Sequence, residues 1–314
     1  RGARVRVGIV GCGLVGRKGA AALAPDDELV ACYDPANPLE PAVDSPQAVF
    51  EAAEAVIVAT PHDALAELTI AALRAGRHVL VEKPAGIGSA QVRAIADAAD
   101  GAYVQVGFNH RFHPAIERAV REARSGEHGE ILHIRARYGH GGRPGYEREW
   151  RADPVRSGGG ELIDQGMHLL DLSHWLLGPL PLHSALLRTA YWDAPVEDNA
   201  VLILGERSAG PWTLFHVSWT EWKNLFSLEI FCRTAKLQVD GLARSYGAQR
   251  LTRYLMRPEL GPPGVDVVEF PADDASWAAE WRYFRRAVAT GAEPTLESAA
   301  YAWSCVEAAY ASCR

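Results

Sequence analysis

The sequence predicts an α/β domain with a doubly wound parallel sheet over residues 1–115, followed by an α+β domain with a large, mostly antiparallel open sheet over residues 116–314. In the first part, short β-branched runs alternate with alanine-rich stretches, as in parallel sheets covered by helices on both faces. In the second part, strand-like runs follow one another across turns, as in antiparallel sheets. A chain of 314 residues with 48% hydrophobic residues is long enough to form both cores.

The individual elements follow from these patterns. In the first domain, strands are expected at RVRVGIV, LVACYD, AVIVAT, HVLVE and YVQVGF, with helices between them. The second domain should begin with a helix over residues 115–125, the strand ILHIRARY, the loop GHGGRPGY and a helix within SGGGELIDQGMHLLDL. Further strands are expected at SALLRTAYW, AVLILGE, WTLFHVSW, FSLEIFC, AKLQVDG and VDVVEF, before two closing helices, SWAAEWRYFRRAVAT and SAAYAWSCVEAAYAS.

Composition disfavours several classes of protein. A net charge of -7 and a pI near 5.9 argue against a nucleic-acid partner, because such proteins carry a basic surface. No apolar run approaches the roughly 18 residues of a membrane-spanning helix, and a strand pattern begins at once, which leaves no room for a secretory leader. The five cysteines form no CxxC pair, so we expect reduced thiols, a cytoplasmic protein and no membrane partner.

The segment GIVGCGLVG carries a G-x-G-x-x-G motif between the first strand and the first helix. In such a motif the first glycine permits a tight turn, the second lets a pyrophosphate approach the backbone, and the third lets helix and strand pack closely. The helix N-terminus then offers amide donors to the phosphates. A purely structural glycine turn is the alternative. We predict a dinucleotide site with contacts from Gly11, Gly13, Leu14, Val15 and Gly16.

An acid at the end of the second strand bears on the choice of cofactor. Asp34 lies 18 residues after Gly16, where a carboxylate accepts hydrogen bonds from an adenosine ribose. It would repel the 2′-phosphate of NADP, and the following PANPLEP offers no arginine to bind one. The sequence therefore favours NAD over NADP. In the alternative, Asp34 only caps the turn before Pro35.

Two further segments carry candidate catalytic groups. VEKPAG places Glu82 and Lys83 after the fourth strand, at the sheet edge where open α/β folds bind ligands. A desolvated lysine there can polarise an oxygen and join a proton relay, although a solvated surface lysine is the alternative. In the helix after the glycine run, Asp164, His168 and Asp171 have offsets 0, 4 and 7 and would share a sector of roughly 60°.

Other interpretations of the helix stay open. Asp171 fits a supporting residue better than a catalyst, and His168 alone would fit a satisfied interface histidine. The acids and histidines of the sequence show no HExxH or comparable spacing, so we expect no metal.

Together, GCGLVG, EKP and GGGELIDQGMHLLDL resemble the Gfo/Idh/MocA oxidoreductase family, over nearly the whole chain. The resemblance implies a Rossmann domain, NAD(P), and oxidation or reduction of a carbinol carbon in a sugar, cyclitol or nucleotide sugar. It implies that His168 takes the hydroxyl proton while Lys83 hydrogen-bonds the oxygen. Asp164 would hold the substrate hydroxyl or orient the histidine.

The resemblance also implies that Thr60 and Pro61 line the ribose and nicotinamide side of the cofactor, near Glu82 and Lys83. The sequence departs from the family just afterwards, at His62 and Leu65, so a role usually given to a histidine at the latter position does not carry over. Many members form dimers or tetramers through the open sheet. We therefore expect a homodimer or homotetramer through the C-terminal sheet.

Candidate substrate contacts lie in GFNHRFHP and RYGHGGRPGYEREWRADP. Aromatic faces stack on sugar rings, and arginines bind carboxylate or phosphate, so these segments suit a charged, nucleotide-linked sugar. These stretches look most like family members of nucleotide-sugar and surface-polysaccharide pathways. A solvated connection or a subunit contact is the alternative for the second segment. With Asp164 and His168, the candidates are Asn109, Arg111, Arg143, Tyr146, Trp150 and Arg151.

Two other functions fit the sequence. One is a regulatory protein that binds a dinucleotide or sugar without turnover, and the intact Lys83, Asp164 and His168 argue against it. The other is a glycosidase or epimerase that holds NAD and oxidises its substrate transiently, which would give product without net cofactor reduction.

Overall fold

The computed structural model describes residues 4–291 and 295–313. Contacts within the chain divide it into two compact units. The first unit contains residues up to Asn109, together with Val155–Gly158 and Trp277–Ala300, and the second contains the remainder. This division differs from the predicted single boundary after residue 115, because two later segments return to the first unit.

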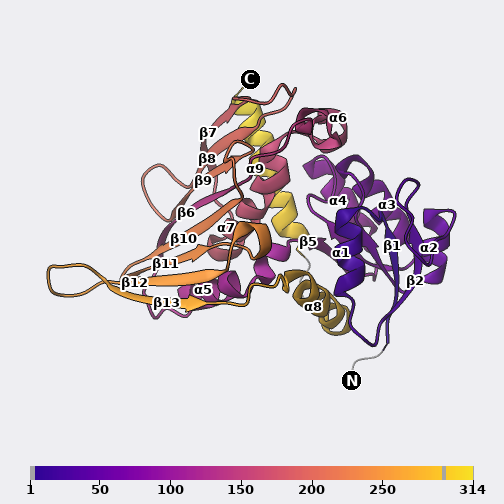
Figure 1. Ribbon diagram of the computed structural model, residues 1–314, viewed down its shortest axis with the longest axis horizontal. Helices are drawn as coiled ribbons and strands as arrows, with labels where there is room; N and C mark the ends of the chain where they lie inside the picture. The colour runs from indigo at the N-terminus through magenta and orange to yellow at the C-terminus, as the bar shows by residue number, and fades with distance from the viewer. Residues whose placement is uncertain (1–3, 292–294, 314) are drawn as a thin grey trace. The chain divides into compact units, whose positions relative to one another are not determined.

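The sheet of the first unit is parallel and has the order β2-β1-β3-β4-β5. Its strands confirm the five predicted runs: β1 (Arg6–Val10), β2 (Glu28–Tyr33), β3 (Ala55–Val58), β4 (His78–Glu82) and β5 (Val104–Gly107). The connecting helices are α1 (Leu14–Ala22), α2 (Pro46–Ala52), α3 (His62–Arg74) and α4 (Ser89–Ala98) (Figure 1). The strand order reverses direction between β1 and β3, so the loops that follow these strands flank the place where such sheets bind ligands.

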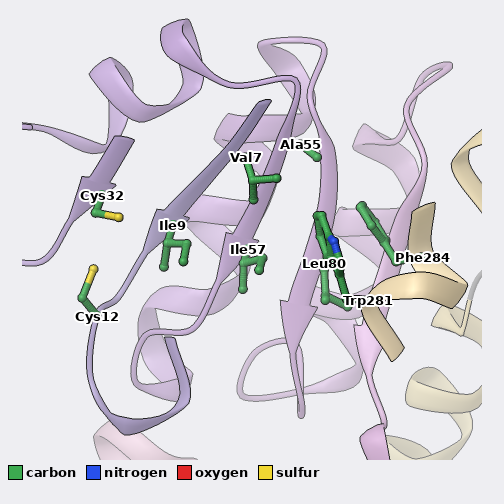
Figure 2. Packing of buried hydrophobic residues seen from close by; sticks show 9 residues of the cluster. All are labelled: Val7, Ile9, Cys12, Cys32, Ala55, Ile57, Leu80, Trp281 and Phe284. Carbon is green, nitrogen blue, oxygen red and sulfur yellow. The ribbon is translucent and has the colours of Figure 1, made fainter. Parts of the chain in front are cut away.

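Helix α8 (Ser276–Thr290) completes the core of the first unit although it comes late in the chain. Its Trp281 and Phe284 are buried against Ile57 and Leu80 (Figure 2), and their two rings stack with centroids 5.2 Å apart. Trp281 Nε1 also donates a hydrogen bond of 2.7 Å to Asp27 Oδ2. Two large aromatic side chains of α8 thus pack into the core of the parallel sheet, which is the physical reason why residues 277–300 belong to the first unit.

The second unit contains an eight-stranded sheet with the order β13-β12-β11-β10-β6-β9-β8-β7 (Figure 1). All neighbouring strands are antiparallel except β6 and β9. The prediction of a large, mostly antiparallel sheet is therefore confirmed. The strands are β6 (Ile131–Gly139), β7 (Leu182–Arg188), β8 (Asn199–Leu204), β9 (Trp212–Ser218), β10 (Leu225–Cys232), β11 (Ala235–Asp240), β12 (Arg250–Leu255) and β13 (Gly264–Glu269).

Two details of this sheet differ from the sequence prediction. Strand β12 was not among the predicted strands. The predicted strand SALLRTAYW ends early, at Arg188, because the backbone N–H groups of Ala190, Tyr191 and Trp192 bind the carboxylate of Asp198 instead of a neighbouring strand. A buried carboxylate that accepts several N–H groups competes directly with ladder pairing.

Helices pack on one face of this sheet, and among the described residues the side chains of its other face are partly exposed. Helix α5 (Pro114–Arg124) contacts β10, β11 and β12, and α7 (Met167–Leu177) contacts β6. Along β6, Ile134 and Ala136 are buried whereas Arg135 and Arg137 are exposed, as alternation in a one-sided sheet requires. Helix α9 (Leu296–Ser312) closes the chain, and within the described part no helix is long and apolar enough to cross a membrane.

An ion pair fastens α5 to the sheet. Arg253 on β12 donates from Nε and Nη2 to the two carboxylate oxygens of Glu122, over 2.7 and 2.5 Å. The Arg253 hydrogen bonds lower the pKa of Glu122 to about 2, with help from Arg118 and against the effect of burial. The pair therefore stabilises the fold only while Glu122 is ionised.

Candidate active site

The three glycines after β1 have three different surroundings. Gly11 has a φ of +92°, and a Cβ on it would lie 2.5 Å from the carbonyl oxygen of Ala59. A Cβ on Gly16 would lie 1.9 Å from the carbonyl oxygen of Gly11, whereas a Cβ on Gly13 would meet nothing within 4 Å. The first and third glycines thus serve the turn and the close packing, and the second leaves open space, while its contact with a phosphate group stays a prediction.

Asp34 is hydrogen-bonded to the glycine loop and to its own turn through backbone N–H groups. Its Oδ2 accepts a hydrogen bond of 2.7 Å from the N–H of Cys12, and its Oδ1 accepts 2.8 Å bonds from the N–H groups of Ala36 and Asn37. Burial alone raises the pKa of Asp34, but these N–H donors outweigh it and hold the pKa below its ordinary value. Asp34 therefore caps its own turn and also ties the glycine loop to β2, while its contact with a ribose stays a prediction.

The remaining predicted cofactor residues of the first unit lie close to these loops. Thr60 and Pro61 follow β3, next to the Ala59 carbonyl that approaches Gly11. Leu14 begins α1 and is 74% exposed, and Val15 follows it. Their contacts with a cofactor remain predictions.

Glu82 and Lys83 lie at the end of β4. Burial raises the pKa of Glu82 to about 7, although the positive charges of Lys83 and Lys18 oppose this shift. Gly107 on β5 leaves room for the carboxylate, since a Cβ there would lie 3.1 Å from Glu82 Oε1. The carboxyl group of Glu82, next to Lys83 in the chain, thus has a pKa near neutral pH.

Replacing Glu82 by Gln should remove a pH dependence of stability. The pKa of Glu82 in the fold, about 7, exceeds the ordinary 4.5. The protonated carboxyl therefore makes its full contribution to the free energy of unfolding below pH 4.5, and this contribution is lost as the pH rises to about 7. We expect Glu82→Gln to match the wild type below pH 4.5 and to exceed its free energy of unfolding by on the order of 2 to 3 kcal/mol above pH 7. Urea titrations of the cofactor-free protein at several pH values measure this. Exposed Glu51→Gln is the control, and equal pH slopes for all three proteins would contradict the assignment.

His62, where the sequence departs from the family pattern, has a structural partner. Its Nδ1 lies 2.8 Å from the carbonyl oxygen of Ser157. Gly158 has a φ of +83°, and a Cβ on it would lie 3.1 Å from Ile87 Cβ. These contacts explain why residues 155–158 belong to the first unit.

The other two glycines of the run pack inside the second unit. A Cβ on Gly160 would lie 2.0 Å from the carbonyl oxygen of Glu197, and one on Gly159 would lie 2.1 Å from the Tyr310 hydroxyl. Glu197 accepts hydrogen bonds from the N–H groups of Gly160 and Leu162 and from Tyr310. The space beside Gly159 and Gly160 is thus filled by residues that hold the N-terminus of the following helix.

The helix after the glycine run begins with a wide turn. Leu162–Gly166 forms a π-helix, and the regular α-helix α7 starts only at Met167. A π turn holds more residues than an α turn, so the rotation between Asp164 and His168 differs from that of two residues four apart on an α-helix. Asp164, His168 and Asp171 nevertheless have different neighbours, and the common sector of their side chains stays a prediction.

Asp164 lies in a charged cluster. Its Oδ2 is 3.4 Å from Nε of Arg151, whose guanidinium lies over the ring of Trp150 at 4.6 Å from the centroid. Ligand atoms of His140, Glu161 and Asp164 all lie within 4.8 Å of one another. Burial lowers the pKa of Arg151, but Asp164 and other anions outweigh it and raise the pKa overall, so the guanidinium stays charged.

This cluster could hold a metal ion, which motif spacing in the sequence did not reveal. Arg151 already supplies a positive charge to it, and burial lowers the pKa of His140. We therefore keep the prediction that no metal is needed.

Turnover should accordingly be unchanged by EDTA and by added divalent cations. Loss of turnover in EDTA that is restored by Zn²⁺, Mn²⁺ or Mg²⁺ would instead assign a metal to His140, Glu161 and Asp164. Metal analysis of the purified protein is the matching measurement.

His168 is buried, with 6% of its surface exposed, and stacks on His110. The two ring centroids are 3.8 Å apart with an interplanar angle of 23°, and the ring of Tyr138 lies 6.2 Å from that of His168. Sequence analysis missed His110. Its signal is the histidine-rich NHRFHP segment, but only the fold brings His110 to His168 at the start of α7.

Asp171 and Arg111 bind each other. Arg111 donates from Nε and Nη2 to the two oxygens of Asp171, over 2.8 and 2.5 Å, and lies over the Trp175 ring. Asp171 is fully buried. The pair favours a structural role for both residues, so the substrate role of Arg111 stays an untested prediction with an alternative explanation.

The other predicted substrate residues are spread over the site. Tyr146 is buried with its ring 5.0 Å from that of Trp219, and the exposed Arg143 pairs with Glu149 at 2.5 Å. Asn109 is buried at the end of the continuous first segment of the first unit. Lys83 belongs to the first unit whereas Asp164 and His168 belong to the second, so their convergence on one substrate carbon remains a prediction.

Comparison with known proteins identifies the family. Residues 5–110 match the family model described as an oxidoreductase family with an NAD-binding Rossmann fold, and residues 116–238 match the GFO/IDH/MocA C-terminal domain. The chain belongs to the Gfo/Idh/MocA family. The predicted resemblance is thus confirmed for both domains, and the glycine loop described above lies in the NAD-binding domain of a Gfo/Idh/MocA protein.

Sequence relatives of this Gfo/Idh/MocA chain include dehydrogenases of sugars and cyclitols. Levoglucosan dehydrogenase of Pseudarthrobacter phenanthrenivorans is 31% identical over 159 residues, which are 49% of this chain and 41% of the relative. Inositol 2-dehydrogenase of Rhizobium meliloti is 30% identical over 225 residues, 64% of each chain. scyllo-Inositol 2-dehydrogenase (NAD(+)) of Bacillus subtilis is 28% identical over 195 residues, 56% of this chain and 54% of the relative. The chain thus spans about half the length of the curated relatives it matches.

Solved structures confirm the fold of both domains. Levoglucosan dehydrogenase in complex with NADH and levoglucosan has a TM-score of 0.85 at 20% identity, covering 98% of this chain and 97% of that one. An NAD binding oxidoreductase from Klebsiella pneumoniae has a TM-score of 0.85 at 19% identity, covering 99% and 97%. The combination of a parallel and a mostly antiparallel sheet is therefore the established Gfo/Idh/MocA architecture.

Proposed function

We propose that this Gfo/Idh/MocA protein is an NAD-dependent oxidoreductase that transfers a hydride between the nicotinamide and a carbinol or keto carbon of a sugar or cyclitol. The main support is that an NAD-binding domain with an open Gly13 position occurs together with buried His168 and with the carboxylates of Glu161 and Asp164 on one helical segment of the second unit. Relatives that act on levoglucosan and on inositols support the same substrate class.

In the proposed reaction each residue has one role. NAD, when bound, accepts the hydride. His168 takes the hydroxyl proton as the carbon is oxidised, and Lys83 donates a hydrogen bond to the same oxygen and stabilises its developing negative charge. Asp164, held by Arg151, accepts a hydrogen bond from a neighbouring substrate hydroxyl.

The charges around the candidate residues favour an uncharged substrate. Three arginines had been candidates for a carboxylate or phosphate of the substrate, and each has a carboxylate partner inside the protein. Arg111 pairs with Asp171, Arg151 with Asp164 and Arg143 with Glu149. We therefore propose a neutral sugar or cyclitol, and the nucleotide-linked sugar favoured by the sequence becomes the comparison substrate.

The cofactor proposal is tested by absorbance of reduced nicotinamide. The protein is incubated with NAD or NADP and with myo-inositol, scyllo-inositol, levoglucosan, glucose and UDP-glucose. We expect NAD reduction with at least one neutral compound, and a lower kcat/KM with NADP because of Asp34. Binding without turnover would support a regulatory protein, and product without net cofactor reduction would support a transient-oxidation enzyme.

We further propose that the chain functions in the cytoplasm. The support is that all five cysteines are free, with Cys12, Cys32, Cys232 and Cys305 buried as thiols. Thiol titration of protein isolated from its native cells under alkylating conditions would test this, and disulfides found there would contradict it.

We also propose that the open face of the second unit's sheet joins identical chains into a homodimer or homotetramer. This face carries partly exposed apolar side chains, among them Leu186, Trp212 and Leu214, between charged pairs such as Arg135 with Glu229. An apolar area flanked by paired charges is typical of a subunit interface.

Replacing Leu214 by Arg should separate the subunits. A charge placed on this face would be buried unpaired in an interface, so we expect a shift toward monomer in sedimentation velocity, with unchanged circular dichroism. Ser208→Arg, in the exposed turn between β8 and β9, is the control with the same change of charge. An assembly that resists the Leu214 change would contradict this interface.

A further inference from the structure

The second unit contains a hollow that the proposed reaction does not use. It has a volume of about 580 Å³, within the range of roughly 300 to 1,000 Å³ for small-molecule sites. Three aromatic side chains, Tyr191, Trp192 and Trp222, form part of its wall, and Tyr191 and Trp222 are each 63% exposed. Water-exposed tryptophan and tyrosine faces grouped in one concave place are typical of ligand sites rather than of solvated loops.

The aromatic wall is held by buried groups. The carboxylate of Asp198, which is fully buried, accepts the N–H groups of Ala190, Tyr191 and Trp192 at 2.7, 2.8 and 2.9 Å. Burial raises the pKa of Asp198, but these donors outweigh it, so its pKa lies below the ordinary value and the anion persists at neutral pH. The Trp192 indole N–H donates to the Trp219 carbonyl at 3.1 Å. The wall is therefore arranged before any ligand arrives.

The glycine-rich loop GHGGRPGY forms the floor of the hollow. A Cβ on Gly141 would lie 2.8 Å from Trp222 Cα, and one on Gly142 would lie 2.5 Å from Trp192 Cζ2. The tryptophans can pack on this loop only because both positions are glycine. A loop that the sequence left open as a solvated connection thus has a defined packing role.

Trp222 adopts a backbone conformation that bulky residues avoid. Its φ is +54°, in the left-handed region that favours glycine. A strained backbone that presents a large aromatic ring to solvent is opposite to what stability alone would select. Such strain is characteristic of functional positions.

Charges around the hollow are balanced. Arg143 pairs with Glu149 at 2.5 Å, and Arg148 lies 3.5 Å from Glu147. Asp193 adds a further carboxylate to the lining. Paired guanidinium and carboxylate groups offer donors and acceptors to hydroxyl groups but no net positive charge to a phosphate.

We propose that this hollow binds a neutral saccharide, with a pyranose ring stacked on Trp222 and Tyr191 and its hydroxyls bonded to the charged rim. The site is separate from the residues assigned to hydride transfer, and Tyr146 lies between the two groups. The ring of Tyr146 is 5.3 Å from that of His140 and 6.0 Å from that of Trp192. The proposal therefore goes beyond the redox function and does not depend on it.

Calorimetric titration of the full chain without cofactor tests the proposal, with cellotriose and maltotriose as neutral probes and UDP as a charged comparator. We expect binding of at least one trisaccharide, and at least tenfold weaker binding for Trp222→Gly. Glycine suits the φ at this position, so that variant should fold normally. Trp222→Phe should restore part of the affinity, because it keeps an aromatic face.

Two control variants separate this site from other surfaces. Trp212→Ala removes a tryptophan that is 39% exposed on the open sheet face, and Asp164→Asn alters the proposed reaction site. Trisaccharide binding should be unchanged in both. The proposal would be overturned if the wild type bound no trisaccharide, if Trp222→Gly still bound it, or if Asp164→Asn lost binding. A Trp222→Gly variant that changed only the oligomeric state would overturn it as well.

Discussion

Replacing His168 by Ala is expected to lower kcat by about 10² to 10⁴, the usual loss when a general base is removed. This corresponds to roughly 3 to 5 kcal/mol of transition-state stabilisation. The affinity for NADH, measured by its fluorescence, should stay near the wild-type value, because the glycine loop and Asp34 lie in the other unit. Steady-state kinetics with the best substrate of the panel provides the measurement.

The control for this experiment is another histidine of the same helix. His174 on α7 stacks on Tyr301, with ring centroids 4.6 Å apart, and is not assigned to the reaction. His174→Ala should keep turnover within a few-fold of the wild type. Because His168 also stacks on His110, thermal unfolding of both variants must show that the fold is intact. Full turnover in His168→Ala would remove this residue from the mechanism.

Replacing Arg253 by Ala should lower the free energy of unfolding by about 3 to 4 kcal/mol. The change leaves Glu122 behind as a carboxylate with only 10% of its side chain exposed. Arg118 remains as a partner of Glu122. The expected loss in the free energy of unfolding is therefore toward the lower end of the range for a buried ion pair that loses one partner. Urea denaturation at neutral pH gives the value.

The pH dependence of this loss identifies its cause. The pKa of Glu122 in the fold, about 2, lies below the ordinary 4.5, so the pair stabilises above pH 4.5 and its contribution is lost as the pH falls toward 2. The difference between wild type and Arg253→Ala should therefore shrink over that range. The double variant Glu122→Leu with Arg253→Met should recover much of the stability at neutral pH, because no buried charge is left unpaired. A difference that is independent of pH would rule out the ion pair as its source.

Elements of the fold could be predicted where a short stretch of sequence carries the whole pattern of the helix or strand. The parallel strands of the first unit were found because each is a short apolar run next to a helix. Strand β12 was missed because Arg250 and Arg253 interrupt its apolar pattern. The charge of Arg253 is compensated by Glu122, which lies 131 positions earlier in the chain, so no window of local sequence contains the explanation.

In the candidate site, too, only patterns within a short stretch of sequence could be predicted. The glycine motif and the acid after β2 are local patterns, and the structure gives each a matching environment. The π turn over Leu162–Gly166 was not predicted, because its sequence, LIDQG, carries no pattern that separates a π turn from an α turn. The stack of His168 on His110 and the Asp164 cluster join segments far apart in the chain. Sequence spacing could therefore name Asp164 and His168 but not their partners.

The position of α8 has a consequence for protein engineering. Trp281 and Phe284 belong to the core of the nucleotide-binding unit, although they come long after its last strand, β5, in the chain. A chimera that exchanged only the first 115 residues with those of a relative would combine one protein's sheet with the other's aromatic residues. Successful recombination has to transplant residues 155–158 and 277–300 together with the N-terminal piece, so three stretches of DNA form one exchangeable module.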